Sequence, residues 1–196
     1  MASYDGDMAT VTTAPKVGPR DRLITTARRL FAAEGIHAVG VDRLCGEARV
    51  SKRSLYQHFS GKDDVVAAAL RDETGHHLHG LHRDDGSPPR DRVLAVFDRL
   101  DDRASRPGFE GCPFIGAAFE LKDPGHPASV VAHEQKLGLT AHFADLLRQG
   151  GASEPDLLAQ QLTLLFDGAS VHGVLHGGAT PATRRAVETL LAAHGM

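Results

Sequence analysis

The chain has 196 residues, of which 41% are hydrophobic and 24% charged, and its formal net charge at pH 7 is −3. No run reaches the roughly 18 apolar residues of a membrane span, and residues 1–19 lack the apolar stretch of about seven residues that a secretion signal needs. The two cysteines, Cys45 and Cys112, are too widely spaced to indicate a disulfide framework or a zinc site. We therefore expect a soluble, cytoplasmic protein without a cofactor.

The charge is unevenly distributed along the chain. Residues 20–62 contain nine Lys and Arg against four Asp and Glu, whereas residues 63–196 contain twelve against nineteen. A basic segment joined to an acidic one is typical of a nucleic-acid module attached to a sensing module. Ordinary solvated faces are the alternative explanation of such charge runs.

The basic segment has the pattern of three helices. Apolar residues recur at helical spacing over 21–34, and Gly35 follows in the position that ends a helix. A shorter helix is predicted over 41–48. Ser51 is placed to cap a third helix that continues to Phe59. Two short helices joined by a tight turn and packed on a longer one form a helix-turn-helix unit.

The third of these helices has two different faces. Leu55 and Phe59 are four residues apart and therefore share a face that can be buried. The remaining positions carry hydrogen-bond donors: Lys52, Arg53, Ser54, Tyr56, Gln57 and His58. Such a helix fits the major groove of DNA.

The rest of the chain is also predicted to be helical. A long fourth helix should begin at Lys62. The run 84–89, rich in Asp, Gly and Pro, should separate it from the fifth helix. Further helices are expected over about 93–105, 112–121, 129–148, 155–175 and 181–193. No segment alternates as a strand does, so the predicted fold class is all-α with about nine helices.

The order of motifs in the basic segment resembles the TetR family of bacterial transcriptional regulators. The motifs are Ala27-x-x-Leu30-Phe31-x-x-x-Gly35, Ala48-Arg49-Val50-Ser51, Ser54-Leu55-Tyr56-x-His58-Phe59 and Gly61-Lys62. The resemblance implies a helix-turn-helix domain over 20–65 and a helical domain over 66–196 that binds a small molecule and dimerises. The composition of residues 1–19 favours a flexible arm before them.

The resemblance also assigns contacts to the third helix. Lys52, Arg53, Ser54 and Gln57 match positions that reach base edges, which suits their side chains. Tyr56, His58 and Lys62 match positions that hold phosphates, and Arg43 and Arg49 are added to the predicted DNA contacts. Packing within the three-helix unit is the alternative for Tyr56, and capping of carbonyls for His58.

Two residues depart from the family pattern. Gly40 stands where the family often has a capping Ser or Thr, so it cannot supply a side-chain phosphate contact. Arg49 stands where the family often has a turn glycine. If that turn needs a positive φ, Arg49 is strained by on the order of 1 kcal/mol.

A ligand pocket is expected in the second half of the chain, where aromatic and polar residues recur among the predicted helices. The candidate wall residues are Phe97, Cys112, Phe114, Phe119, His133, Phe143, Phe166 and His172. Plain core packing is the alternative for each. Cys112 is also a candidate redox or electrophile sensor, although a buried structural cysteine explains it as well.

The predicted function is a ligand-responsive regulator, most simply a repressor that binds a palindromic double-stranded DNA operator as a homodimer through its last two helices. Small residues over 168–178 favour close approach of helices there. A constitutive regulator is one alternative. Metal sensing is another, because His76, His79 and His82, and also His172 and His176, have helical spacing. Enzymatic activity is not expected, since no nucleophile elbow, phosphate loop or paired metal motif is present.

Overall fold

The computed structural model describes residues 17–81, 86–178 and 180–196, with side chains assigned outside 75–85 and 179. Within these residues the protein is all-α, as predicted, and contains no strand. Its helices are α1 (Pro19–Glu34), α2 (Val41–Ala48), α3 (Lys52–His58), α4 (Lys62–Leu81), α5 (Pro89–Ala104), α6 (Pro113–Leu121), α7 (Pro127–Gln149), α8 (Pro155–His176) and α9 (Pro181–Ala193).

Proline marks where most of these helices begin. It occupies the first position of α1 and of α5 to α9. The fixed φ of proline suits this position, and its missing N–H is one that a first helical turn leaves unbonded in any case. The structure therefore begins α5 and α7 slightly earlier than the apolar periodicity alone predicts. None of the described helices has the length and apolar character to cross a membrane.

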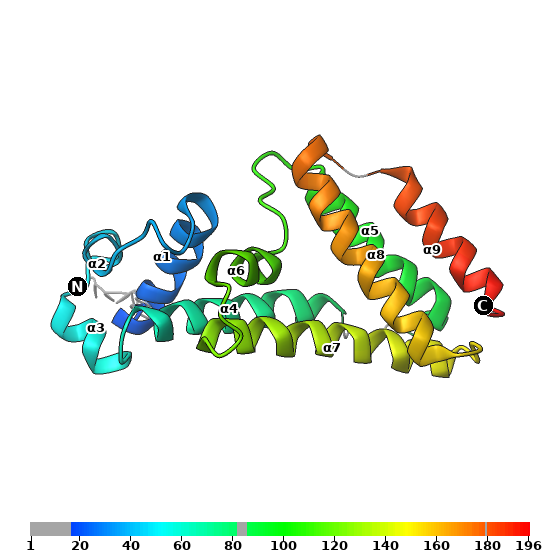
Figure 1. Cartoon of the computed structure of the whole chain (residues 1–196), viewed down its shortest axis with the longest axis horizontal. Coiled ribbons are helices and arrows are strands. Elements are labelled where there is room, and N and C mark those ends of the chain that lie inside the picture. The colour runs from blue at the N-terminus through cyan, green and yellow to red at the C-terminus, as the bar shows by residue number, and fades with distance from the viewer. Residues whose placement is uncertain (1–16, 82–85, 179) are drawn as a thin grey trace, which may run out of the picture.

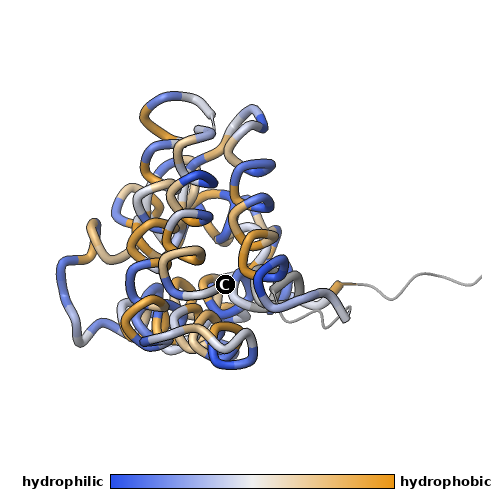
Figure 2. Tube along the Cα trace, turned by 90° about the vertical axis from the view of Figure 1, so that its right-hand side faces the viewer, coloured by the Kyte–Doolittle hydropathy of each residue, from blue (hydrophilic) through white to orange (hydrophobic). Residues whose placement is uncertain are grey.

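The helices form an elongated molecule in which α1, α2 and α3 lie at one end and α9 at the other (Figure 1). The long helices α4 and α7 pack against each other between the two ends, and α6 packs on α7 near α1. At the far end α5, α7, α8 and α9 share a core built around Phe97, Phe143 and Leu162. Hydrophobic and hydrophilic stretches alternate along the helices, as amphipathic packing requires (Figure 2).

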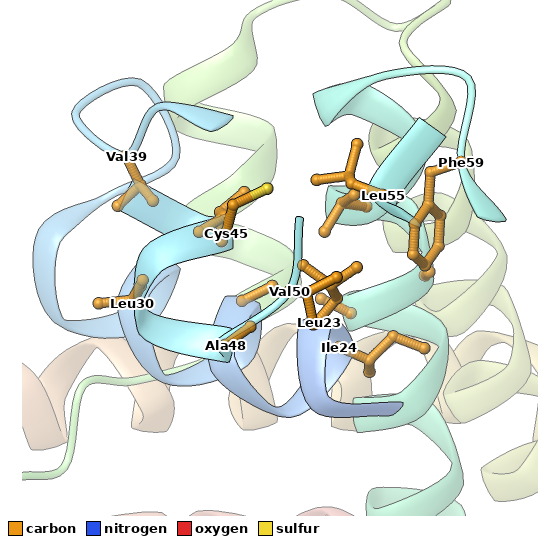
Figure 3. Close-up of a cluster of buried hydrophobic side chains, with 14 residues drawn as sticks. Leu23, Ile24, Leu30, Val39, Cys45, Ala48, Val50, Leu55 and Phe59 are labelled. Carbon is orange, nitrogen blue, oxygen red and sulfur yellow. The ribbon is translucent and has the colours of Figure 1, made fainter. Parts of the chain in front are cut away.

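The three N-terminal helices and the start of α4, which we call the head, enclose their own core. Leu23, Leu30, Leu44 and Leu55 are completely buried in it. Figure 3 shows Leu23, Leu30 and Leu55 between α1, α2 and α3, with Phe59 at the end of α3. Leu44 belongs to the same cluster. Each such leucine stabilises the fold by about 1.5–3 kcal/mol relative to an exposed one. The head is therefore a packed unit with a hydrophobic core of its own.

Helix α4 belongs both to the head and to the rest of the molecule. Val65 and Ala68 pack in the core of the head, whereas Val66 and Leu70 pack in a second cluster with α6 and α7. The predicted domain boundary at residue 65 therefore falls within a continuous helix that both parts share. Of the predicted arm, residues 1–16 lie outside the described part of the chain.

Arg49 ends α2 in the left-handed conformation, with φ 53° and ψ 48°. Its backbone N–H donates to Gly46 O, and the Val50 N–H donates to Cys45 O at 3.0 Å. These hydrogen bonds close the tight turn between α2 and α3, as the turn geometry of a helix end requires. The turn therefore needs a positive φ at Arg49, which is the condition under which strain was expected there.

We predict that Arg49→Gly raises the free energy of unfolding by about 0.5–1 kcal/mol, because glycine adopts this conformation without the Cβ clash. Arg49→Ala is the matched control, since it removes the same side chain and keeps the clash. Chemical denaturation measures both variants. Equal stability of the two variants would show that the backbone at this position is not strained.

Candidate nucleic-acid interface

Helix α3 is short and is fixed at both ends. The hydroxyl of Ser51 accepts a hydrogen bond from the Ser54 N–H at 3.1 Å, as the predicted cap requires. At the other end, the Phe59 N–H donates to Leu55 O at 2.9 Å, and both side chains are buried in the head. Burial of one face leaves the opposite face of α3 pointing away from the protein.

That outer face carries the residues predicted to contact DNA. Lys52, Arg53, Tyr56, Gln57 and His58 are exposed, and Ser54 is partly exposed. The ring of Tyr56 is among the most exposed large apolar groups of the chain, with 57% of the residue accessible. A packing role for Tyr56 within the head is therefore not what the structure shows. Its hydroxyl is available to a phosphate.

Lys52 is held by a carboxylate of the neighbouring helix. Its Nζ lies 2.5 Å from Oδ1 of Asp42, which is in the first turn of α2. The hydrogen bond to Asp42, followed by the charge of that carboxylate, raises the pKa of Lys52. Both side chains are more than half exposed, so solvent screens the pair. Asp42 therefore competes with any other anionic partner of this ammonium.

Arg43 also has carboxylate partners. Its guanidinium lies 3.0 Å from Glu34 of α1 and 3.5 Å from Glu47 of its own helix, and Glu47 in turn pairs with Arg29. This network ties α2 to α1 along the surface of the head. It gives Arg43 a structural partner in the free protein, which the sequence prediction of a DNA contact did not include.

The ends of the predicted surface are formed by Gly40, Arg20 and Lys62. Gly40 precedes α2 in an extended conformation and provides no side-chain cap, as expected. Arg20, which the sequence prediction did not include, places its guanidinium 5.7 Å from the centre of the Phe59 ring. Lys62 is the first residue of α4 and is partly exposed. Arg20 therefore adds a cation beside the end of α3.

Glu120 attaches α6 to the head. Its carboxylate accepts hydrogen bonds from the backbone N–H of Ile36 at 2.8 Å and of His37 at 2.6 Å, and it lies 3.0 Å from His37 Nδ1. Burial raises the pKa of Glu120, but the hydrogen bonds from His37 and Ile36 outweigh burial and lower it overall. The carboxylate is therefore ionised and holds the connection between α1 and α2.

His126 makes a second attachment, at the start of α7. Its Nδ1 accepts a hydrogen bond from the Ala128 N–H at 3.1 Å, which caps α7. In the neutral ring the proton is then on Nε2, which lies 3.3 Å from Oδ1 of Asp63 beside Lys62. Both ends of the segment that joins α6 to α7 are thus bound to the head. These attachments lie more than 60 residues apart in sequence, which is why sequence reasoning missed them.

The residues predicted to form a ligand pocket do not gather around one cavity. Phe97 and Phe143 are completely buried and stack with ring centres 5.7 Å apart. Phe114, Phe166 and Cys112 line a core cavity of about 30 Å³. Phe119 and His133 lie instead on an open groove between α6, α7 and α8, which Phe114 also touches. Helix rotation separates Phe114 from Phe119, since five residues turn a helix by one full revolution and more than a third of the next.

His172 lines none of these cavities. Its ring packs against that of His176, with centres 4.4 Å apart. Within the part of the chain that the structure describes, no group of three His, Cys, Asp or Glu side chains is arranged to hold a metal ion. His82, and the side chains of His76 and His79, fall outside the described set.

A larger cavity, of about 400 Å³, lies where the head meets α6. We call it the joint cavity. Its walls come from α1, α4, α6 and the segment before α6, together with Arg103 of α5. They include Phe31, Leu70, Phe109, Cys112 and Glu120. Of the predicted pocket residues only Cys112 belongs to it, because the prediction considered helices after the head and not the space between them.

Comparison with known proteins agrees with this geometry. The family described as bacterial regulatory proteins, tetR family, matches residues 23–69, which contain the whole of α3. A structure from Streptomyces avermitilis, described as a TetR transcriptional regulator, is 42% identical and has a TM-score of 0.86, covering 92% of this chain and 100% of that one. A TetR-family transcriptional regulator from Streptomyces coelicolor is 34% identical with a TM-score of 0.82, covering 91% and 90%. The transcriptional activator FasR of Mycolicibacterium smegmatis is 32% identical over 93 residues, 44% of this chain and 42% of its own length.

The pairing of Lys52 with Asp42 generates a prediction about DNA affinity. Asp42→Asn should raise the affinity for duplex DNA severalfold at low salt, because it frees Lys52 and removes a carboxylate from the outer face. The gain should shrink as salt is added. Titration of labelled DNA at several salt concentrations measures the effect.

Asp102→Asn is the control, since it removes an exposed carboxylate from α5, which is not part of the head. An equal gain for Asp102→Asn would show that net charge alone acts. A loss of affinity for Asp42→Asn would show that the pair positions Lys52 correctly for DNA.

Proposed function

Because the chain belongs to the TetR family of transcriptional regulators, we propose that it is a repressor which binds a palindromic operator as a homodimer and releases it when a small molecule binds. The observation that carries the DNA-binding part is the outer face of α3. A capped helix with one buried face presents a continuous row of cationic, amide and hydroxyl groups to solvent. This is the chemistry that reads base edges and phosphates in a major groove.

The proposed contacts divide by chemistry. Arg53, Lys52, Ser54 and Gln57 take the base edges, since guanidinium and ammonium groups suit guanine and an amide suits adenine. Tyr56, His58 and Lys62 take phosphates. Arg49, which is exposed in the turn before α3, is a further phosphate contact. Arg43 contacts a phosphate only if DNA displaces its guanidinium from Glu34 and Glu47.

The proposed dimer uses the outer surface of α8 and α9. Leu157, Leu164, Val171 and Leu175 follow one another along α8 at intervals of seven, seven and four residues and are 43–72% exposed. Beside them, a shallow apolar groove between α8 and α9 contains Gln161, whose Oε1 is buried and unpaired among the described residues. An exposed apolar stripe with an unsatisfied polar atom is the surface that a second copy would cover.

The small residues of α8 serve two purposes. A Cβ at Gly173 would lie 2.9 Å from Ala104 Cβ and 2.9 Å from the Phe109 ring, so this glycine is needed for packing within one subunit. Gly168 has open space around its position and remains available for close approach of a partner helix. Of these two glycines, we therefore assign Gly168 and not Gly173 to the proposed dimer interface.

The proposed operator contacts predict two kinds of loss. Gln57→Ala should weaken binding to the operator by about 1–3 kcal/mol for each half-site. It should also relax the base preference at the one base pair that Gln57 contacts, and change binding to random DNA little. Lys62→Ala should weaken all sequences alike and lower the slope of affinity against salt by about one per subunit. Binding to a panel of single-base operator variants separates the two. Equal losses on operator and random DNA for Gln57→Ala would overturn its assignment.

The proposed dimer surface is tested by Leu164→Arg, which places a charge in the centre of the stripe. Both subunits of a twofold dimer carry the substitution in the same interface. The dimer dissociation constant should therefore rise on the order of a hundredfold or more. Leu137→Arg is the matched control, because Leu137 is a comparably exposed leucine of α7. Analytical ultracentrifugation measures the dissociation. A dimer that tolerates Leu164→Arg lies elsewhere on the molecule.

A further inference from the structure

The joint cavity is bounded both by the head and by the rest of the molecule, since residues of α1, α4 and α6 line it together. Its volume of about 400 Å³ falls in the range of sites for small organic molecules. The core cavity, at about 30 Å³, has room for a water molecule or two and not for an organic ligand. The two are separated by the segment 109–112, because Phe109, Gly111 and Cys112 line both.

The walls of the joint cavity are mainly apolar. Phe31 of α1, Val66 and Leu70 of α4, Phe109, and Ala117 of α6 face it from different sides. Each of the four elements contributes at least one such side chain. A molecule with an apolar body would therefore contact the head and α6 at the same time.

The charged groups around the cavity give it an acidic balance. Glu73, Glu110 and Glu120 line it, against Arg28 and Arg103. Arg28 and Glu73 compensate each other, because Arg28 Nε donates to Glu73 at 2.7 Å; its Nη1 also donates to Asp72 at 2.8 Å. With that pair set aside, the wall carries two carboxylates, Glu110 and Glu120, against the guanidinium of Arg103. Within the described residues, Glu120 is bound by the amides of Ile36 and His37 and by the His37 ring, and Glu110 is exposed. The arrangement favours a cation over an anion.

Glu120 connects this cavity to the head. The carboxylate lines the cavity and at the same time accepts the hydrogen bonds of Ile36 and His37. Gly35 permits this approach, since its φ is 85° and a Cβ there would lie 3.2 Å from Glu120 Oε1. A cation in the cavity would compete with the two amides for the carboxylate. A bulky body would also press α6 away from α1.

We propose that the joint cavity binds a small organic molecule with an apolar body and one positive charge, and that its occupancy reaches α3 through Glu120. The proposal rests on the proposed ligand-responsive function and gives it a site and a ligand class. The bound molecule would bind more tightly when the contact of α6 with the head is loosened than when that contact is intact. It therefore shifts the protein toward the loosened state, which binds DNA more weakly.

Cys112 makes the cavity accessible to experiment. It is partly exposed, whereas Cys45 is buried in the head, where burial and the charge of Asp42 raise its pKa. Alkyl methanethiosulfonates transfer their S-alkyl group to a thiolate, forming a disulfide and releasing methanesulfinate. Three reagents compare an apolar, a cationic and an anionic group at one position: benzyl, 2-aminoethyl and 2-sulfonatoethyl methanethiosulfonate.

The rate constant of each reagent with Cys112 is divided by its rate constant with free 2-mercaptoethanol, which removes differences in intrinsic reactivity. We expect this relative rate to be higher for the aminoethyl reagent than for the sulfonatoethyl reagent. Glu110→Gln should reduce this preference. Benzyl modification of the full chain should weaken operator binding by about tenfold. Failure of Cys112 to react, or an excess rate for the anionic reagent, would overturn the proposed site or its ligand class.

The matched control carries the thiol on the other side of α6. Cys112→Ser with Ser129→Cys places it on the open groove that contains Ser129, and its benzyl adduct should bind DNA normally. If the unmodified chain does not bind DNA, the proposed function fails. If it binds and the Cys112 adduct binds equally well, only the cavity proposal fails.

The role of Glu120 is tested separately. Glu120→Gln keeps the shape and removes the charge, so it should weaken DNA binding by itself, and benzyl modification should then add little. A full further tenfold loss in Glu120→Gln would show that occupancy reaches α3 by another route. Circular dichroism and thermal unfolding establish that the variant is folded before this comparison.

Discussion

A helix of seven residues does not persist in water on its own, because it forms too few hydrogen bonds to offset its nucleation. The buried side chains of Leu55 and Phe59 and the hydroxyl of Ser51 hold α3 in place. The rest of the recognition surface depends on this anchoring. With the inner face of α3 fixed in the head, every donor on the outer face has a defined direction, and the turn at Arg49 sets the angle at which α3 leaves α2.

The head is in turn held by a small number of directed contacts. Helix α4 shares its apolar residues between two clusters, and the segment between α6 and α7 is bound at both ends, by Glu120 and by His126. Hydrogen bonds of this kind have a preferred geometry and can be exchanged for others, unlike the close packing of a core. A regulator needs such exchangeable contacts between its sensing and reading parts. The joint cavity lies against one of them.

Local patterns in the sequence were sufficient to predict the secondary structure, including the short helix α3 and its cap. Proline at the first helical turn, glycine after α1 and Ser51 before α3 act on neighbouring backbone, so they can be read without the tertiary structure. The all-α class and the family followed from them. The orientation of α3 could also be predicted, since Leu55 and Phe59 define which face is buried.

Contacts between distant segments could not be predicted in this way. Glu120 is separated by 83 residues from His37, and nothing in its neighbourhood distinguishes it from other surface glutamates. The predicted pocket residues were chosen for their chemistry, but Phe114 and Phe119 point to different sides of α6, one buried and the other 72% exposed. Which side faces a cavity depends on how α6 rotates against α1 and α7. That rotation is a property of the assembled fold.

The most direct test of the account is to select bound duplexes from a random DNA pool with the full chain and to footprint the enriched sequence. We expect a palindrome with two protected half-sites on one face of the duplex, their centres about 34–36 Å apart or a multiple of this distance. We also expect the protection to disappear when Arg53 and Gln57 are both replaced by Ala. Failure to enrich any sequence, or an undiminished footprint from that double variant, would contradict the assignment of α3 as the reader.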